Sequence, residues 1–278
     1  MMNFIEQIKS TTQLRWNRVH KFKVKVPMYF EAGSYIVKTA ESSSELIESF
    51  RLRNQVFNNE FKGHDKDGLD FDKFDYFFDH LVIYHKDSEQ VIGTYRLNCT
   101  TQFTQSYTGL EFDLKPLQHA NGPYLELGRA CIKKEFRKGS VISLLWRGIA
   151  EYMNLSGAQL LFGCSSLKMS NAREAALVFR YLEQQSQLST AFVCEPTKKF
   201  QMKNLDAWMN YFENGLTPYQ ITEAQDLIPS LLNSYLKLGA KVAGPPAFDE
   251  DFNCIDLLTV LKKEDLSKCL ADKLQINR

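Results

Sequence analysis

The stretch YLELGRACIKKEFRKGSVISLLWRGI, residues 124–149, decides the fold. Its first part, residues 124–132, is apolar apart from a few polar positions, of which only Glu126 and Arg129 are charged. Such short apolar runs are typical of buried strands. A short basic turn with one glycine follows, and the remaining residues are apolar at helical spacing. We therefore predict a strand, a turn and a helix, with two ionisable side chains on the strand.

The turn consists of Arg137, Lys138, Gly139 and Ser140, and it lies where the helix is expected to begin. Unpaired backbone N–H groups and the helix dipole both favour an anion at such a position. We therefore predict that these residues bind a phosphate group. The alternative is a basic turn that only caps the helix.

The composition argues against several classes of protein. The chain has 278 residues, of which 44% are apolar and 24% charged, and its net charge of +1 gives no overall field that attracts nucleic acid. Its six cysteines form no CxxC pair, which favours free thiols in a reducing compartment. Its five histidines show no metal-ligand spacing, so we expect no metal site.

No apolar run is long enough to span a membrane, and the N-terminus lacks the apolar core of a secretory signal. We expect a cytoplasmic protein, with a peripheral position on the inner membrane face left open. Residues 1–34 are predicted to be an appendage, and residues 35–278 a single domain with a C-terminal extension. Residues 15–26 alternate basic with apolar side chains, which suits either docking on acidic lipid headgroups or an acidic protein, or an edge strand protected by lysines.

The rest of the chain alternates between segments with the hydrophobic period of strands and segments with that of helices, which predicts one mixed α/β sheet. The turn composition of residues 86–90 predicts a hairpin between its two flanking strands. The other expected elements are strands at 35–40, 81–85, 91–99, 159–165, 192–194, 241–243 and 254–261, and helices from about 45, at 172–184 and at 227–238.

Several segments resemble the GNAT superfamily of acyltransferases: residues 79–83, 91–97, 124–149 and 244–249. They resemble most its acyl-ACP-dependent N-acyltransferases, the ornithine-acyl-ACP N-acyltransferase or hemolysin-like branch, which is related to the acyl-homoserine-lactone synthases. The resemblance implies a GNAT-like fold. Its sheet would be mixed, mostly antiparallel and splayed at strand 124–132, with helices on both faces.

The resemblance also implies a reaction, the transfer of a fatty acyl group, often 3-hydroxylated, from acyl-carrier protein to the α-amine of an amino acid. Ornithine is the leading acceptor, and the product would serve lyso-ornithine lipid synthesis. No cofactor would be bound permanently, and acyl-phosphopantetheine, on carrier protein or coenzyme A, would be the co-substrate. The shortened turn lacks a second small residue, which favours carrier protein. The alternatives are a lactone synthase or other N-acyl-amino-acid synthase, and a non-catalytic acyl-carrier or lipid-binding module.

Glu126 is the candidate general base, acting through a water, since its family counterpart is a recurring active-site acid. It could instead bind substrate, or form a structural ion pair with Arg129. That pair would need a bulge near Gly128, because residues at i and i+3 of a strand point to opposite faces. Arg129 is expected to orient groups or bind the substrate's carboxylate. The backbone N–H groups of Cys131 or Ile132 are the predicted oxyanion donors.

A second polar group precedes the strand and matches the family arrangement around an amino-donor site. It consists of Arg53, Asp72, Asp75 and Arg96, together with Phe57. The acids would bind the donor's ammonium and the arginines its carboxylate. The chain has no Trp shortly after Phe57, which sets it apart from the lactone synthases. The alternative is a solvated acidic loop.

Near the C-terminus the stretch 244–249, GPPAFD, is very similar to an extension of the ornithine branch. Asp249 or Asp256 could bind a second ammonium, such as that of the ornithine side chain. Asp256 could equally be the first residue of a buried strand, because an apolar run follows it.

Overall fold

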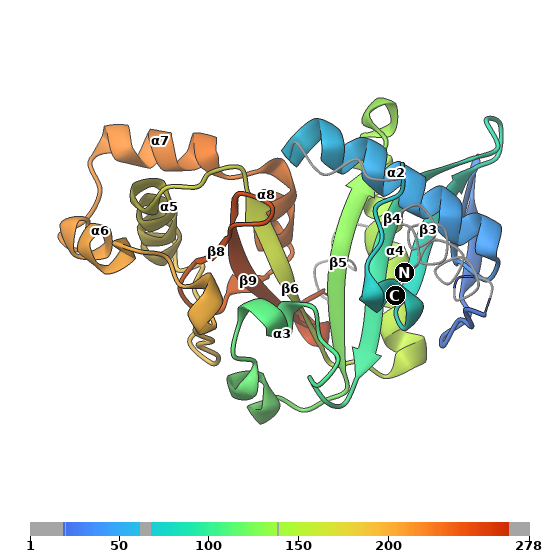
Figure 1. Cartoon of the computed structure of the whole chain (residues 1–278), viewed down its shortest axis with the longest axis horizontal. Coiled ribbons are helices and arrows are strands. Elements are labelled where there is room, and N and C mark those ends of the chain that lie inside the picture. Colours follow the sequence, from blue (N-terminus) through green and yellow to red (C-terminus); the bar gives the residue numbers. More distant parts are fainter. Residues whose placement is uncertain (1–18, 20, 62–67, 138, 267–278) are drawn as a thin grey trace, which may run out of the picture. The chain divides into compact units, whose positions relative to one another are not determined.

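The structure is a computed structural model that describes residues 19, 21–61, 68–137 and 139–266 (Figure 1). The chain groups into two compact units, each discontinuous in sequence. The first unit comprises residues 1–98 and 129–155, and the second residues 99–128 and 156–278. The single domain expected from residue 35 stays a prediction.

The strands form a nine-stranded, mostly antiparallel sheet with the order β1-β2-β3-β4-β5-β6-β9-β7, and β8 pairs with β9. This arrangement confirms the predicted mixed sheet. The strands are β1 (Tyr29–Ala32), β2 (Tyr35–Thr39), β3 (Asp79–His85), β4 (Gln90–Thr100), β5 (Tyr124–Ile132), β6 (Leu160–Leu167), β7 (Lys241–Val242), β8 (Ala247–Asp249) and β9 (Cys254–Lys262).

Helices fill most of the connections between the strands. They are α2 (Ser43–Phe61), η1 (Lys73–Tyr76), α3 (Thr108–Glu111), η2 (Lys115–His119), η3 (Lys134–Phe136), α4 (Gly139–Ser156), α5 (Ala172–Gln184), η4 (Lys198–Phe200), α6 (Leu205–Tyr211), α7 (Pro218–Leu227) and α8 (Ser230–Lys237). In the described part of the chain, none of these helices combines the length and apolar character that a bilayer crossing requires.

The first unit packs a helix on each face of its strands. Successive side chains of a strand point to opposite faces, so Leu81 and Val82 of β3 reach different layers. Leu81 and Val37 lie under α4, where a Cβ on Gly148 would be 3.0 Å from each side chain. Val82 belongs instead to the buried cluster of Phe50 and other residues of α2. The expected helices on both faces are therefore confirmed in this unit.

In the second unit, successive side chains of β9 likewise point to opposite faces of the sheet. Ile255 and Leu257 pack with the buried face of α5, and α6 and α7 pack in turn against α5 (Figure 1). Leu258 and Val260 point the other way and join a cluster that contains Phe162 of β6. This second cluster positions the residues of the candidate site that lie in this unit.

Two predicted elements need correction. The helix expected over 227–238 begins later than predicted, because α8 runs from Ser230 to Lys237 and Leu227 is the last residue of the separate helix α7. Pro229 lies between them, and proline has no N–H to donate to a continuous helix. Residues 192–194 form no strand, although Cys194 donates its backbone N–H to the carbonyl oxygen of Ala243.

Part of the expected appendage is built into the first unit. The backbone N–H groups of Lys25 and Val26 donate to the two carboxylate oxygens of Asp79 at 2.9 Å each, and β1 pairs with β2. Residues 15–18 and 20 lie outside the described residues. The docking of residues 15–26 on lipid or protein stays a prediction.

Candidate active site

Strand β5 parts from its neighbour β6 after a short parallel ladder. In the described residues of the second unit, the register pairs Tyr124–Glu126 with Leu160–Phe162, although β6 continues to Leu167. At the end of this ladder the backbones approach closely, since a Cβ on Gly163 would lie 2.3 Å from the carbonyl oxygen of Leu127. The ladder ends where the sequence predicts that the sheet splays.

Glu126 occupies the last position of that ladder, in the second unit. Its side chain is buried, with 2% of the residue's surface exposed. One carboxylate oxygen accepts the backbone N–H of Thr108, the first residue of α3, at 2.6 Å. This bond fixes the carboxylate relative to the backbone, which a general base requires for directional proton transfer. Its catalytic role stays a prediction.

Arg129 follows on the same strand but belongs to the first unit. Its φ of +51° is in the left-handed region, which non-glycine residues rarely adopt. The backbone irregularity expected near Gly128 is therefore found at Arg129. The guanidinium lies 3.4 Å from an oxygen of Asp70 and 3.3 Å from one of Asp72. These contacts hold the side chain on the acidic segment that precedes η1.

The polar residues predicted to surround an amino donor form a buried ion-pair network in the first unit. Arg53 donates to both oxygens of Asp75 at 2.8 and 3.0 Å and to Asp70 at 2.9 Å. Arg96 donates to Asp72 at 2.8 Å and to Asp75 at 3.2 Å. The acids therefore do not form a solvated loop.

Charge pairing outweighs burial in this network. Burial alone would raise the pKa of Asp75, but the charges of Arg53 and Arg96 hold that pKa well below its ordinary value. His80, whose ring lies 3.8 Å from Asp75, differs from Asp75 in the effect that dominates. Burial outweighs the nearby negative charge and lowers the pKa of His80 to about 4. At neutral pH Asp75 is therefore ionised, and the imidazole of His80 is neutral.

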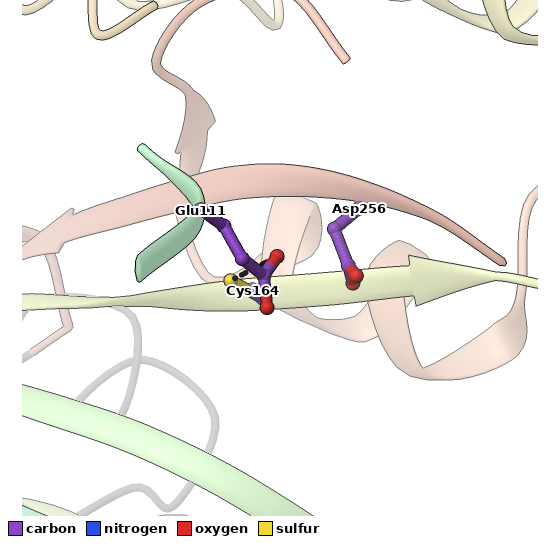
Figure 2. A group of neighbouring side chains, drawn as sticks. All are labelled: Glu111, Cys164 and Asp256. Carbon is purple, nitrogen blue, oxygen red and sulfur yellow. Dashed lines mark hydrogen bonds between the residues drawn. The ribbon is translucent and has the colours of Figure 1, made fainter. Parts of the chain in front are cut away.

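The second unit holds a different kind of cluster, drawn in Figure 2. Glu111 of α3, Cys164 of β6 and Asp256 of β9 bring their polar atoms within 4.8 Å of one another. The Cys164 thiol donates to Glu111 at 3.3 Å, and Ser166 donates to Asp256 at 2.6 Å. No arginine or lysine is among the buried residues described in this unit. The acids here are therefore stabilised by hydrogen bonds and protonation.

The pKa shifts in this cluster follow from that environment. Burial, with the nearby Asp256, raises the pKa of Glu111 to about 9, and burial raises that of Asp256 to about 6. Burial also raises the pKa of the Cys164 thiol well above its ordinary value. At neutral pH the Glu111 carboxyl and the thiol hold their protons, whereas Asp256 is largely ionised. Such a set can accept and share protons.

The predicted phosphate turn lies between η3 and α4 in the first unit. Arg137 donates from Nε to the carbonyl oxygen of Ile132 at 2.9 Å, and Gly139 is the first residue of α4. No acidic residue stands in the first turn of α4, so no negative charge there opposes an anion. Ser140 is exposed, Cys131 is buried, and Lys138 lies outside the described residues.

Comparison with known proteins shows which family and which named proteins this chain is similar to. Residues 52–147 match the family described as "Acetyltransferase (GNAT) domain". The chain is an acyltransferase with a GNAT domain. It is 29% identical to an L-ornithine N(alpha)-acyltransferase of Brucella abortus (strain 2308), over 84% of this chain and 86% of that protein. It is 27% identical to a protein of the same name from Rhodobacter capsulatus, over 84% and 92%.

Among solved structures, the acyltransferase is similar to a CoA-dependent acyl-homoserine lactone synthase, with 14% identity and a TM-score of 0.47 over 84% of each chain. The predicted GNAT fold and the predicted acyltransferase activity are both confirmed by the family match and the named relatives.

Sequence reasoning missed three polar residues of the acyltransferase. Asp70 stands two positions before Asp72, and the density of aspartates in that segment could have pointed to it. Glu111 stands between Leu110 and Phe112, where apolar and acidic residues alternate, and this pattern does not distinguish a buried acid from an exposed one. Cys164 gives no signal, because its importance depends on neighbours that are distant in sequence.

Asp249, predicted to bind an amino group, is buried in the second unit. Its carboxylate accepts the backbone N–H groups of Asp251 at 2.8 Å and Phe252 at 3.1 Å. These bonds stabilise the turn between β8 and β9. A role for Asp249 in the acceptor site stays a prediction.

Proposed function

We propose that this acyltransferase moves a fatty acyl group, of the kind often 3-hydroxylated in this family, from acyl-carrier protein to the α-amine of ornithine, as in lyso-ornithine lipid synthesis. One observation carries the proposal: four similar proteins bear the name L-ornithine N(alpha)-acyltransferase, and each alignment spans at least 81% of this chain. The donor is an acyl thioester in either case, and the choice of carrier protein over coenzyme A rests on the shortened basic turn.

The chemistry needs no covalent intermediate on the protein. The neutral α-amine attacks the thioester carbonyl carbon, and Glu126 accepts one amine proton through a water. When the C–S bond breaks, that proton is returned to sulfur, which leaves an amide and a free pantetheine thiol. The fixed orientation and burial of Glu126 support this role.

Backbone groups would stabilise the charge of the intermediate and the donor's phosphate. The N–H groups of Cys131 or Ile132 are the proposed oxyanion donors. The phosphate of the pantetheine arm is proposed to bind at the turn of residues 137–140. The absence of an acid from the first turn of α4 supports this placement.

The ion-pair network suggests how the acceptor's amino-acid group is held. Arg53 and Asp75 are buried and bind one another, so their proposed role is to position the more accessible members. The side chain of Asp72 is 27% exposed and that of Arg129 13%. We assign Asp72 to the α-ammonium and Arg129 to the carboxylate. Arg96 holds the Asp72 carboxylate in place through their 2.8 Å contact.

A diamino acid carries a second ammonium. Among its described residues, the second unit has buried acids and no buried lysine or arginine, so these acids are available to bind that ammonium. Asp249 and Asp256 are the proposed partners. L-Norvaline tests this idea, since it has the ornithine carbon skeleton without the second amine. Its kcat/KM is expected to be at least about tenfold lower, because a charge-assisted hydrogen bond contributes roughly 1.5–3 kcal/mol.

The decisive experiment combines 3-hydroxyacyl-carrier protein with ornithine, norvaline or S-adenosylmethionine, and measures products by mass spectrometry and free thiol. N-acylornithine with stoichiometric thiol supports the proposal. Release of methylthioadenosine would instead identify a lactone synthase. Binding of donor without any product would identify a non-catalytic module. Replacing the carrier protein by coenzyme A in the same assay identifies the preferred donor.

Glu126→Gln tests the base in the same assay. The variant keeps the side-chain shape, and kcat is expected to fall by about 10²–10⁴-fold, which is the usual contribution of a general base. Glu151→Gln is the matched control, since Glu151 is exposed on α4. Unchanged product formation by Glu126→Gln would exclude Glu126 as the base.

A further inference from the structure

The cluster of Glu111, Cys164 and Asp256 in the second unit brings together the donor atoms of a metal site (Figure 2). One oxygen of each carboxyl group and the sulfur all lie within 4.8 Å of one another. The three residues belong to α3, β6 and β9, so separate parts of the chain supply them. In a tetrahedral site with metal–ligand distances of about 2.0–2.3 Å, ligand atoms lie roughly 3.3–3.8 Å apart. A small inward movement of the side chains would therefore place all three atoms on one ion.

The charge balance of the second unit points to a cation as the ligand. Glu111 and Asp256 are 2% and 3% exposed, and no lysine or arginine is among the buried residues described in this unit. Buried acids in proteins are usually paired with a cation or coordinate a metal. Asp75 of the first unit follows this rule, since two arginines donate to its carboxylate. The described part of the second unit has the acids without such a partner, which leaves that role to an ion from outside the chain.

The thiol determines which ion fits. Ca²⁺ and Mg²⁺ take oxygen ligands, whereas Zn²⁺ takes sulfur and carboxylate oxygen together. Cys164 is half-buried, and Ser166, two positions further along β6, is exposed. Residues two apart on a strand lie on the same face, so this face of β6 offers the ion a route to the cluster.

Neighbouring side chains hold the Asp256 carboxylate in a fixed orientation. Ser166 donates to one oxygen at 2.6 Å, and the buried thiol of Cys254 donates to the other at 3.7 Å. Outer groups of this kind orient the ligating carboxylates of metal sites. The cluster thus has three ligands and the support that such ligands need.

We propose that Glu111, Cys164 and Asp256 bind a zinc ion, whose fourth position is open to water. The prediction that the chain has no metal site was based on the spacing of its histidines. That spacing does not detect ligands of other residue types that are so far apart in sequence. The proposal goes beyond acyl transfer, and the site can be tested without any activity.

Proton release provides the first test. Before an ion binds, the Glu111 carboxyl and the Cys164 thiol hold their protons at neutral pH, because burial raises both pKa values. Zinc ligands must be deprotonated, so about two protons should leave for each zinc ion bound. Calorimetric titration with Zn²⁺ in buffers of different ionisation enthalpy measures this number. Binding to ionised carboxylates on the surface would release no protons and would contradict the proposal.

Cobalt identifies the sulfur ligand directly. Co²⁺ occupies zinc sites and gives a sulfur-to-metal charge-transfer band only when a thiolate is bound to it. We expect this band when the wild-type protein receives a stoichiometric amount of Co²⁺, and we expect Zn²⁺ to remove it. Cys164→Ser should abolish the band. Cys194→Ser should keep it and is the matched control, since Cys194 is another buried thiol of the second unit.

Glu111→Gln tests a carboxylate ligand in the same titrations. Its affinity for Zn²⁺ should be at least about tenfold lower, because the loss of even an orienting partner costs that much in metal sites. Thermal unfolding checks that each variant is folded. A wild-type protein without the cobalt band, or a band that persists in Cys164→Ser, would overturn the proposal whether or not the variants fold.

Zinc should also compete with the acceptor, a consequence that rests on the proposed function, in which Asp256 can bind the second ammonium of ornithine. Zn²⁺ should then raise the KM for ornithine without lowering kcat, and leave the KM for norvaline unchanged. Zinc binding without this competition supports the metal site and would place the second ammonium away from Asp256. The binding measurements need no acceptor, so failure of the proposed function is distinguishable from failure of the metal site.

Discussion

The raised pKa of Glu111 gives the sharpest test of the buried cluster in the second unit. Its pKa rises from 4.5 to about 9, mainly through burial. Below the lower value both the folded and unfolded states hold the proton. As the pH rises, the unfolded chain loses it first, so the free energy of unfolding falls by about 1.4 kcal/mol per pH unit until the folded pKa is reached.

Glu111→Gln removes this titration and keeps the shape of the protonated carboxyl. Its amide can still accept from Cys164 and donate toward Asp256. Between about pH 5.5 and pH 8, the wild-type protein should lose roughly 3 kcal/mol that the variant retains. The measurement is urea unfolding at both pH values, analysed for the difference between variant and wild type.

Glu151→Gln provides the control, since an exposed carboxylate on α4 should leave the pH dependence unchanged. The ionisation of Asp256 contributes to both proteins and cancels in the comparison to first order. If Glu111→Gln and wild type lost stability in parallel over this pH range, Glu111 would be ionised in the folded protein. The account of the cluster in terms of burial would then be wrong.

Three further substitutions test the packing and ion pairs by urea unfolding. Asp75→Asn leaves the buried Arg53 without its bidentate partner and should cost about 3–5 kcal/mol. Gly163→Ala places a Cβ 2.3 Å from a backbone carbonyl oxygen of β5 and should cost at least about 3 kcal/mol, so a neutral result would mean that the strands are farther apart. Asp70→Asn weakens the contact that holds Arg129 and should lower the free energy of unfolding by about 1–3 kcal/mol. If that contact positions a reacting group, kcat should also fall under conditions in which the variant is fully folded.

Local sequence signals were sufficient for most of the regular elements. Strand β5 and helix α5 begin and end at the predicted residues. α5 has a local start signal, because Asn171 accepts the backbone N–H of Glu174 as an N-cap. The start of α8 was predicted too early because Pro229, which precedes its first residue, stands within an apolar pattern whose helical spacing includes residues on both sides of it.

The candidate site was only partly predictable, because its pairs join residues far apart in sequence. Glu126 and Arg129 were recognised within one strand, but the contact of Arg129 with Asp72 spans 57 residues. Glu111 and Cys164, which share a hydrogen bond, are separated by 53 residues. No local periodicity encodes such contacts. Glu111, Cys164 and Asp256 come together because β6 pairs with β9 in the sheet and because α3, which follows β4 in the sequence, packs near them.

Where the pKa of a buried acid is shifted, it is lowered in the first unit and raised in the second, and this difference bears on the mechanism. In the first unit Asp70 and Asp75 lie against arginines, whose charges lower both pKa values despite burial. An acid held in this way keeps its charge and accepts protons poorly, which suits a fixed anion that binds an ammonium.

In the second unit Glu111 and Asp256 lie near one another and near the Cys164 thiol, and burial raises their pKa values to about 9 and about 6. Proton acceptors are most effective when their pKa lies near the working pH. We therefore propose that proton transfer takes place in the second unit, which contains Glu126, and that Asp72 of the first unit binds the α-ammonium. Steady-state kinetics test this division, since Glu126→Gln should mainly lower kcat, whereas Asp72→Asn should mainly raise the KM for the amino acid.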